Sequence, residues 1–443
     1  MSEDNRSRLK QWLESGEARL HVLTFPQREL WEASPVAVGD VANHICAFIQ
    51  VRGTVSIKDC EAAVQRVVER HDVLRSSFLP GKAQPLQMVR STGTANVHYR
   101  ELTPAEQTPE AQEEVMREIF VRPFDMVRGP LYRVELLQRA PDDILMVLAI
   151  HHAIADGWTL GVFVQDLVAA YLQSKHKLGA ALPPVPFSYS DWGAAERAYW
   201  QPALLEDRAG FWKPQLAGSQ QLWASPIETG PLQRVILEVP PDLTAAVREL
   251  ARGNSATLFN TLLTAFQWTL AKWTGKGDIT VGTPVANRNK QAANETMGYF
   301  AGNVPLRSQV EHDKPFTTAL KECRESAMDA FANAMPFVEL ALALNDRPAP
   351  GHHPVYSVRF ALQNHPVPDV NLPGFSVKLR MRSTGTARFD LGCEITEEGA
   401  GLEVVWLYRP SLFTRADIDT LNSLFLIVLT KVSQSPECRL SLV

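Results

Sequence analysis

Several common catalytic signatures are missing from this chain of 443 residues. The sequence has no GxSxG nucleophile elbow, no P-loop, no GxGxxG after a strand and no HExxH motif. These absences argue against the common serine hydrolases, P-loop and dinucleotide-binding enzymes, and zinc peptidases. Spacing alone does not decide against a Ser-His-Asp or Cys-His arrangement, but no local pattern supports either.

Cysteine is scarce, and long apolar runs are absent. Without a CxxC pair we expect no disulfide framework and no metal site, in a reducing compartment. No stretch reaches the roughly 18 apolar residues that a membrane span needs, and the charged N-terminus MSEDNRSRLKQWLESGEA is not a secretory signal. We therefore expect a cytoplasmic protein. The cysteines are Cys46, Cys60, Cys323, Cys393 and Cys438.

Strong charge of either sign is also lacking. The net charge is −5, both signs are interspersed, and no basic tract occurs, so neither nucleic acid nor an anionic membrane is an expected partner. Hydrophobic residues make up 45% of the chain, as in soluble globular proteins. The length allows two lobes of about 200 residues each.

Strands and helices are predicted in both halves of the chain, which indicates an α/β protein of two similar lobes. The segment GAALPPVPFS, residues 179–188, holds three prolines and is the clearest linker. We therefore predict a first lobe over residues 1–180 and a second over residues 181–443.

The stretch ILMVLAIHHAIADGW, Ile144–Trp158, contains the most informative pattern. Its apolar beginning predicts a buried strand. If the strand is regular to its end, alternation puts His152 on the face of Ile150 and His151 on the opposite face. Asp156-Gly157 then makes a turn, and Thr159 is expected to cap a following helix. A histidine at such a strand end suits proton transfer.

Two similar patterns elsewhere are interpreted as loops. His365 and Asp369 repeat the HxxxD spacing among prolines, and His352-His353 is a second histidine pair without an aspartate four residues on. Ile144–Trp158 alone combines the strand, the pair, the Asp-Gly turn and the helix. A histidine centre without a protein nucleophile suits direct acyl transfer to an amine or alcohol, in which the protein orients both reactants, handles a proton and stabilises the oxyanion.

Six segments, in order along the chain, resemble the motifs of the condensation domains of nonribosomal peptide synthetases, in the superfamily that includes chloramphenicol acetyltransferase. They are LTFPQRELW, RHDVLRSSF, IHHAIADGWT, YSDWGAAERAYW, GTPVANR with MGYFAGNVPLR, and PVYSVRFALQN. The resemblance implies two acetyltransferase-like lobes in a V-shaped pseudo-dimer with a central tunnel. It also implies no bound cofactor, because donor and acceptor arrive on the phosphopantetheine arms of carrier proteins.

The resemblance also assigns roles to residues. His152 would act on the attacking amine as general base or by positioning it, while His151 would be a satisfied core histidine. Asp156 would form a structural salt bridge with Arg70 or Arg75 of RHDVLRSSF. Gly157 would leave room near the pantetheine or the oxyanion. Trp158 would support the motif, and the candidates for the tunnel and lobe bridge are Tyr299, Phe300, Asn303 and Gln363.

The chain departs from the family pattern in three places. Pro26-Gln27-Arg28 replaces the commoner Ala-Gln-x-Arg, and Phe300–Asn303 replaces Phe-Val-Asn-Thr, which puts the acceptor in question. Trp406 and Arg409-Pro410 stand where Tyr and Thr-Asp are frequent. The histidine motif is neither the HRxxxDD of recruitment domains nor the DxxxxD of cyclisation domains.

The predicted function is condensation of a carrier-bound acyl thioester with an amine, or with a hydroxyl, in the biosynthesis of a nonribosomal peptide such as an antibiotic or siderophore. The alternatives are a non-catalytic module that recruits carriers or tailoring enzymes, and an acyltransferase that uses coenzyme A and a soluble acceptor. The protein could be free-standing, N-terminal in a synthetase, or an excised domain.

Overall fold

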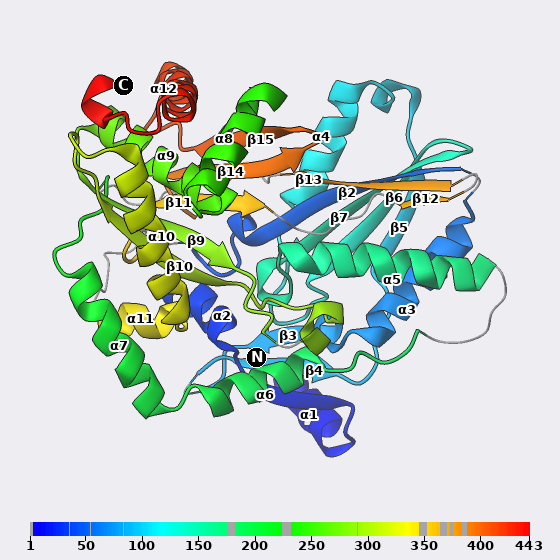
Figure 1. Ribbon diagram of the computed structural model, residues 1–443. Coiled ribbons are helices and arrows are strands. Elements are labelled where there is room, and N and C mark those ends of the chain that lie inside the picture. Colours follow the sequence, from blue (N-terminus) through cyan, green and yellow to red (C-terminus); the bar gives the residue numbers. More distant parts are fainter. Residues whose placement is uncertain are drawn as a thin grey trace.

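The computed structural model describes residues 3–34, 36–53, 55–82, 84–175, 182–223, 232–289, 291–344, 352–363, 370–372, 375–382 and 388–443. Two halves, each built on a six-stranded sheet, lie side by side (Figure 1). A small sheet in the order β1-β4-β3 lies beside helix α1 near the N-terminus. The mixed α/β architecture that the sequence predicts is confirmed.

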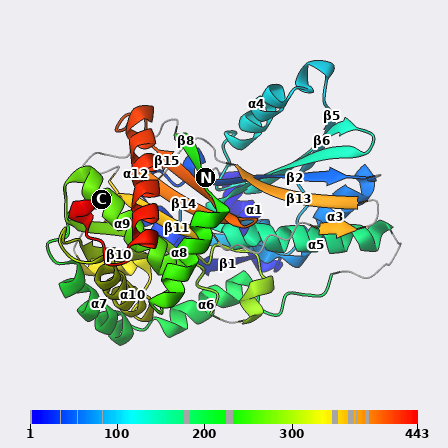
Figure 2. The ribbon, with the colours of Figure 1, turned by 45° about the horizontal axis from the view of Figure 1, so that its top comes forward.

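The first large sheet has the order β12-β13-β2-β7-β6-β5. Helices α3 and α5 pack together beneath it, and α4 lies on the other side (Figures 1 and 2). The elements of this half are α1 Glu3–Glu14, β1 Ala18–Val22, α2 Phe25–Arg28, β2 His44–Arg52, α3 Ile57–Arg70, β3 Ser76–Leu79, β4 Leu86–Arg90, β5 Val97–Glu101, α4 Pro109–Phe120, β6 Tyr132–Ala140, β7 Asp143–His151 and α5 Gly157–Lys175.

The second large sheet has the order β10-β9-β11-β14-β15-β8. Helices α8, α9 and α12 pack against one another on it (Figure 2). The elements of this half are α6 Tyr189–Tyr199, α7 Pro202–Leu216, β8 Gln233–Val239, α8 Pro241–Gly253, α9 Leu258–Thr274, β9 Asp278–Val285, β10 Gly302–Gln309, α10 Phe316–Ala332, α11 Phe337–Ala343, β11 Val358–Gln363, β12 Val370–Leu372, β13 Phe375–Arg382, β14 Leu391–Glu398, β15 Gly401–Tyr408 and α12 Arg415–Gln434.

Helix α3 illustrates how local sequence fixes an element. Ser56 caps its first turn by accepting a hydrogen bond from the backbone N–H of Asp59. The apolar residues repeat at helical spacing, so one face is buried against the sheet and α5. The helix extends from Ile57 to Arg70, the range over which this spacing persists.

Strands β12 and β13 belong to the second half in sequence but complete the sheet of the first. Strand β13 pairs antiparallel with β2, with Arg382 opposite Cys46. Tyr189, Trp192 and Phe300 are likewise buried in the core of the first half. The predicted boundary after residue 180 falls within residues 176–181, which lie outside the described residues, and it stays a prediction.

Two further sequence predictions concern loops and membranes. The HPVPD segment from His365 to Asp369 lies outside the described residues, whereas His352-His353 lies in a loop, as predicted. None of the helices in the described ranges is long and apolar enough to cross a membrane.

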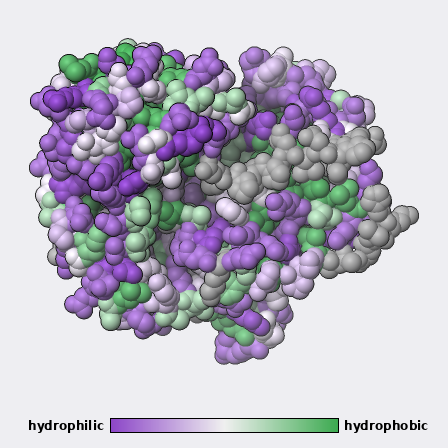
Figure 3. Space-filling view, in the orientation of Figure 1, coloured by the Kyte–Doolittle hydropathy of each residue, from purple (hydrophilic) through white to green (hydrophobic). Residues whose placement is uncertain are grey.

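The surface is notched where the two halves meet, at the top of Figure 3. A cleft of about 540 Å³ lies at this junction between α4 of the first half and β8 and β13. A larger cavity of about 1220 Å³ lies between α1, β4 and residues 125–130, and neither histidine of the pair lines it. Volume therefore does not identify the site, whose position follows from the histidine motif.

Candidate active site

Strand β7 places the histidine pair at its end. It lies between β2 and β6, and His151, its last residue, is opposite His44 of β2. His152 is already the first residue of a short 3-10 turn, His152–Ile154. The strand thus ends one residue earlier than the alternation argument assumed. The backbone turn, rather than strand alternation, therefore directs the side chain of His152 away from that of His151.

His151 is fully buried and has both ring nitrogens occupied. Its Nε2 lies 2.8 Å from the carbonyl oxygen of Val38, and its Nδ1 accepts a hydrogen bond of 3.0 Å from the N–H of Ala153. These contacts fit the neutral ring with the proton on Nε2. Burial lowers the pKa of His151 to about 3. This ring therefore supports the turn and is not available to a substrate.

His152 is half-buried and keeps its ring largely free. The ring contacts that of Tyr299 edge to face, with 4.6 Å between centroids, and its Nδ1 has no hydrogen-bond partner among the described residues. Burial first, and then repulsion by Arg388 and Arg359, lowers the pKa of His152 well below its usual value. The imidazole is thus neutral near pH 7 and able to accept a proton.

Asp156 is 3% exposed and joins the two halves. Its Oδ1 lies 3.0 Å from a guanidinium nitrogen of Arg288, and its Oδ2 accepts a hydrogen bond of 3.1 Å from the N–H of Phe300. The expectation that Arg70 or Arg75 would pair with it is wrong. The partner comes from GTPVANR, after β9, a segment whose position relative to the motif depends on the tertiary fold.

Asp156 also caps helix α5. Its Oδ1 accepts hydrogen bonds from the N–H of Thr159 at 2.9 Å and from the Thr159 hydroxyl at 3.0 Å. Thr159 was expected to be the cap, but the helix begins at Gly157 and Thr159 is its third residue. Trp158, between them, donates from Nε1 to the carbonyl of Asn294 at 3.0 Å. Gly157 and Trp158 therefore lie at the junction of the two halves.

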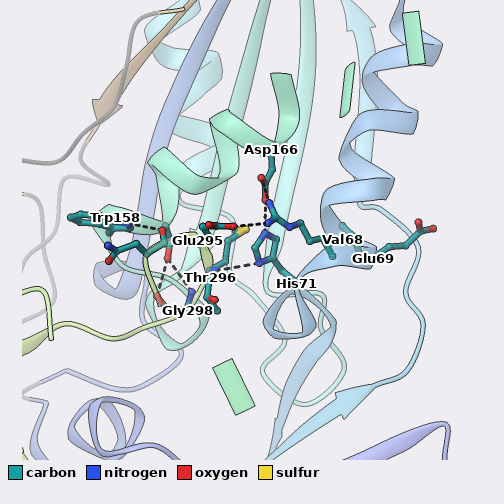
Figure 4. A network of polar contacts seen from close by, with 12 residues as sticks. Val68, Glu69, His71, Trp158, Asp166, Glu295, Thr296 and Gly298 are labelled. Atoms are coloured by element: carbon teal, nitrogen blue, oxygen red, sulfur yellow. Dashed lines mark hydrogen bonds and ion pairs between the residues drawn. The ribbon is translucent and has the colours of Figure 1, made fainter. Parts of the chain in front are cut away.

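A second network of polar contacts contains His71, Asp166 and Glu295 (Figure 4), and Arg70 belongs to it. Arg70 forms ion pairs with Asp166 of α5 and Glu295 of the second half. Next to it, Nε2 of His71 lies 2.6 Å from Asp166, and Nδ1 of His71 accepts a hydrogen bond of 3.3 Å from the N–H of Met297. This network fixes the segment that leads to Tyr299 and Phe300.

Arg75 has a purely local role. Its guanidinium donates to the carbonyls of Glu69 and His71 at the end of α3, at 2.8 and 3.3 Å, and to that of Arg90 in β4 at 3.0 Å. A cation at the C-terminal end of a helix satisfies its last carbonyls. Arg75 therefore stabilises RHDVLRSSF without contacting the histidine motif.

The predicted bridge residues divide into two groups. Tyr299 touches His152, Phe300 is buried under the guanidinium of Arg288 at 3.9 Å, and Asn303 of β10 bonds to Glu29. Gln363 ends β11 opposite Thr396 of β14, and no contact in the described part of the chain links it to His152. The structure therefore brings three of the four candidates to the site.

Sequence reasoning missed several residues of the site. Gln27 donates from Nε2 to the carbonyl of Ala153 at 2.9 Å, inside the histidine turn. The positive charge of Arg388 lowers the pKa of His152 and acts on Tyr299 as well. Gln27, Glu29 and Arg288 stand in recognised motifs, which was an available signal, whereas nothing local marked Arg388.

The departures at the end of β15 have a structural explanation. Arg409 lies 3.4 Å from Asp390, and both are almost fully buried. Trp406 packs in the core of the second half, with its ring 5.7 Å from that of Phe266. Both residues serve that core and lie apart from the histidine turn.

The family model described as Condensation domain matches residues 18–443. The chain is 30% identical over 414 residues to tyrocidine synthase 3 of Brevibacillus parabrevis, covering 92% of this chain and 6% of that protein. It is 27% identical over 433 residues to bacitracin synthase 3 of Bacillus licheniformis, covering 96% of this chain and 7% of that protein. The chain thus spans less than a tenth of the length of either synthase.

Solved structures show the same fold. The X-domain from teicoplanin biosynthesis is similar with a TM-score of 0.82 at 22% identity, covering 95% of this chain and 96% of that one. The first condensation domain of the calcium-dependent antibiotic synthetase, solved with a substrate analogue, gives 0.81 at 20% identity, covering 96% and 98%. These likenesses confirm the two-lobed acetyltransferase-like fold. The chain belongs to the condensation domain family.

Proposed function

We propose that this chain catalyses the condensation of an acyl group, held as a thioester on the phosphopantetheine arm of a carrier protein, with an amine presented by a second carrier or free in solution. The product is an amide in a nonribosomal peptide or a related compound. The observation that supports this most directly is the neutral, half-buried His152 imidazole beside a fully satisfied His151.

In this reaction the amine nitrogen attacks the thioester carbonyl. A carbon–nitrogen bond forms, and the carbon–sulfur bond then breaks. The imidazole of His152 accepts the proton that the amine loses and returns it to the departing thiolate, so the ring is neutral again at the end. The Asp156–Arg288 pair holds the turn that orients His152, which is a positioning role.

A recruitment role is the second candidate, because the X-domain, with the same fold, has been solved in complex with OxyB. Such a module would bind a carrier or a tailoring enzyme without forming a bond. The intact HHAIADG turn favours catalysis. The two roles differ in a measurable way, since only catalysis depends on the imidazole of His152.

The decisive test pairs the protein with the carrier domains encoded beside it, loaded with acyl donors and aminoacyl acceptors, and follows the masses of the loaded carriers. Wild type should transfer the acyl group, and His152→Ala should not. His312→Ala, at an exposed histidine, is the matched control and should retain full transfer. Carrier binding without transfer across the panel would establish recruitment instead. Turnover with acyl-coenzyme A alone would establish the coenzyme A-dependent alternative.

A further inference from the structure

A buried carboxylate lies near the histidine site without a role in the chemistry described above. Glu29 follows helix α2 and is only 7% exposed. Its Oε1 accepts a hydrogen bond of 2.6 Å from the side-chain amide of Asn303, and its Oε2 accepts none from the described residues. The preceding Arg28 pairs instead with Glu32 and Glu339, at 3.0 and 2.6 Å. One carboxylate oxygen of Glu29 is therefore left for a ligand.

Tyr299 connects this carboxylate to the reactive histidine. Its ring contacts that of His152, and its hydroxyl is close enough to Glu29 and Arg388 to interact electrostatically with both. The charged and titratable groups that interact electrostatically with Glu29 are Tyr299, Tyr356 and Arg388. No contact ion pair joins Glu29 to Arg388 within the described ranges. Glu29 and His152 thus share Tyr299 and Arg388 as neighbours, with the carboxylate unpaired.

An unpaired carboxylate in such a place is energetically unfavourable unless a cation or a proton joins it. Burial raises the pKa of Glu29 to about 7, against the opposing effects of Arg388 and Asn303. The carboxyl can therefore take or release a proton near neutral pH. A ligand ammonium group would satisfy the free oxygen and keep the carboxylate ionised.

We propose that Glu29 binds the ammonium form of the amine acceptor and removes its first proton, before His152 acts on the attacking nitrogen. The inference rests on the proposed function and adds a residue that binds the acceptor. The structure supports it through the free oxygen of Glu29 and the shared neighbour Tyr299.

The acceptor loses two protons in the reaction, and Glu29 and His152 each remove one of them. An amine in water near pH 7 carries two protons more than the amide nitrogen that it becomes. Glu29 takes the first proton and gives a nucleophilic amine, and it later releases that proton to solvent. His152 takes the second during attack and passes it to the thiolate. An alcohol loses only one proton and needs no carboxylate.

The test compares two acceptors that differ at a single atom. One probe is the alanyl thioester of N-acetylcysteamine, and the other is the lactyl thioester, with a hydroxyl in place of the amine. Glu29→Gln keeps an oxygen for Asn303 but removes the charge. With the amine at pH 7 we expect kcat/KM to fall about 10- to 100-fold, as for loss of a charge-assisted contact. With the hydroxyl we expect a change below about threefold, and the loss with the amine should shrink as the pH approaches the pKa of the amine.

Each outcome separates the two proposals. Equal loss with both acceptors, no loss with either, or a wild type that prefers the hydroxyl would overturn the role of Glu29 and leave condensation standing. A wild type that condenses neither probe nor any carrier-bound acceptor would overturn the proposed function itself.

A measurement on the unmodified enzyme covers the case in which Glu29→Gln does not fold. The trimethylglycyl thioester carries a fixed positive charge and no nucleophile, and the 3,3-dimethylbutyryl thioester is its neutral isostere. We expect the charged analogue to inhibit amine condensation competitively and about 10-fold more strongly than the neutral one. Equal inhibition by the two would contradict a carboxylate at the acceptor position.

Discussion

Asp156 and Arg288 form a buried ion pair of 3.0 Å that joins the histidine turn of the first half to the loop after β9 in the second. The side chains are 4% and 2% exposed. Arg288 also donates to the carbonyl of Thr296 at 2.8 Å. One guanidinium thus fixes both the turn that follows His152 and the segment that ends in Tyr299.

Removal of Arg288 should therefore destabilise the whole protein. Arg288→Ala leaves the Asp156 carboxylate buried without its counter-charge, which typically costs about 3–5 kcal/mol. Urea unfolding followed by circular dichroism measures this. Arg248→Ala is the matched control, because Arg248 pairs with Glu397 at the surface, and its loss should cost about 0–1 kcal/mol. Equal losses of unfolding free energy in the two variants would show that the buried pair contributes no more to stability than the surface pair.

The sequence predicts the elements well where a local pattern suffices. The buried strand that ends at His151 and the helix after the Asp-Gly turn are both found, because apolar spacing and caps act over a few residues. Strand β8 was missed. It is an edge strand with Ile236 46% exposed, so its burial pattern is weak.

The contacts between distant segments could not be predicted in the same way. Arg70 and Arg75 were the expected partners of Asp156 because the family resemblance implied an arginine of RHDVLRSSF. Arg288 is the actual partner, because the loop after β9 extends across the junction between the two halves. The position of Glu29 next to Asn303 also depends on how the halves meet, and no periodicity encodes that.

The two adjacent histidines should respond oppositely to substitution. His151→Ala removes the acceptor for the N–H of Ala153 and the donor for Val38, so we expect a loss of about 2–4 kcal/mol in the free energy of unfolding. His152→Ala removes a half-buried ring whose Nδ1 makes no hydrogen bond with the described residues, so stability should change by less than about 1 kcal/mol. Equilibrium unfolding of both variants in urea checks this, and a strongly destabilised His152→Ala would contradict it.

Acid should weaken the fold through His151. Its pKa falls from 6.5 in the unfolded chain to about 3 in the folded protein, so between these values the unfolded chain binds more protons. The contribution of His151 to stability is therefore complete above pH 6.5 and is lost as the pH falls toward 3. His151→Gln, which cannot be protonated, should show a shallower fall in unfolding free energy between pH 6.5 and pH 4 than wild type. The exposed His312→Gln is the control and should follow wild type, and coincident slopes for all three would contradict the assignment.

Gln27 is expected to act on catalysis by positioning the histidine turn. Its Nε2 donates to the carbonyl of Ala153, and its Oε1 accepts from the N–H of Thr24 at 3.0 Å, so both ends of the amide are fixed. Gln27→Met keeps the length of the side chain but releases the turn, and a small displacement of a reacting group can cost about 10- to 100-fold in rate. We expect that loss in kcat, with little change in KM for the acceptor, because the acceptor-binding groups are untouched. Pre-steady-state transfer from a loaded carrier separates the two parameters, and a change confined to KM would place Gln27 in substrate binding instead.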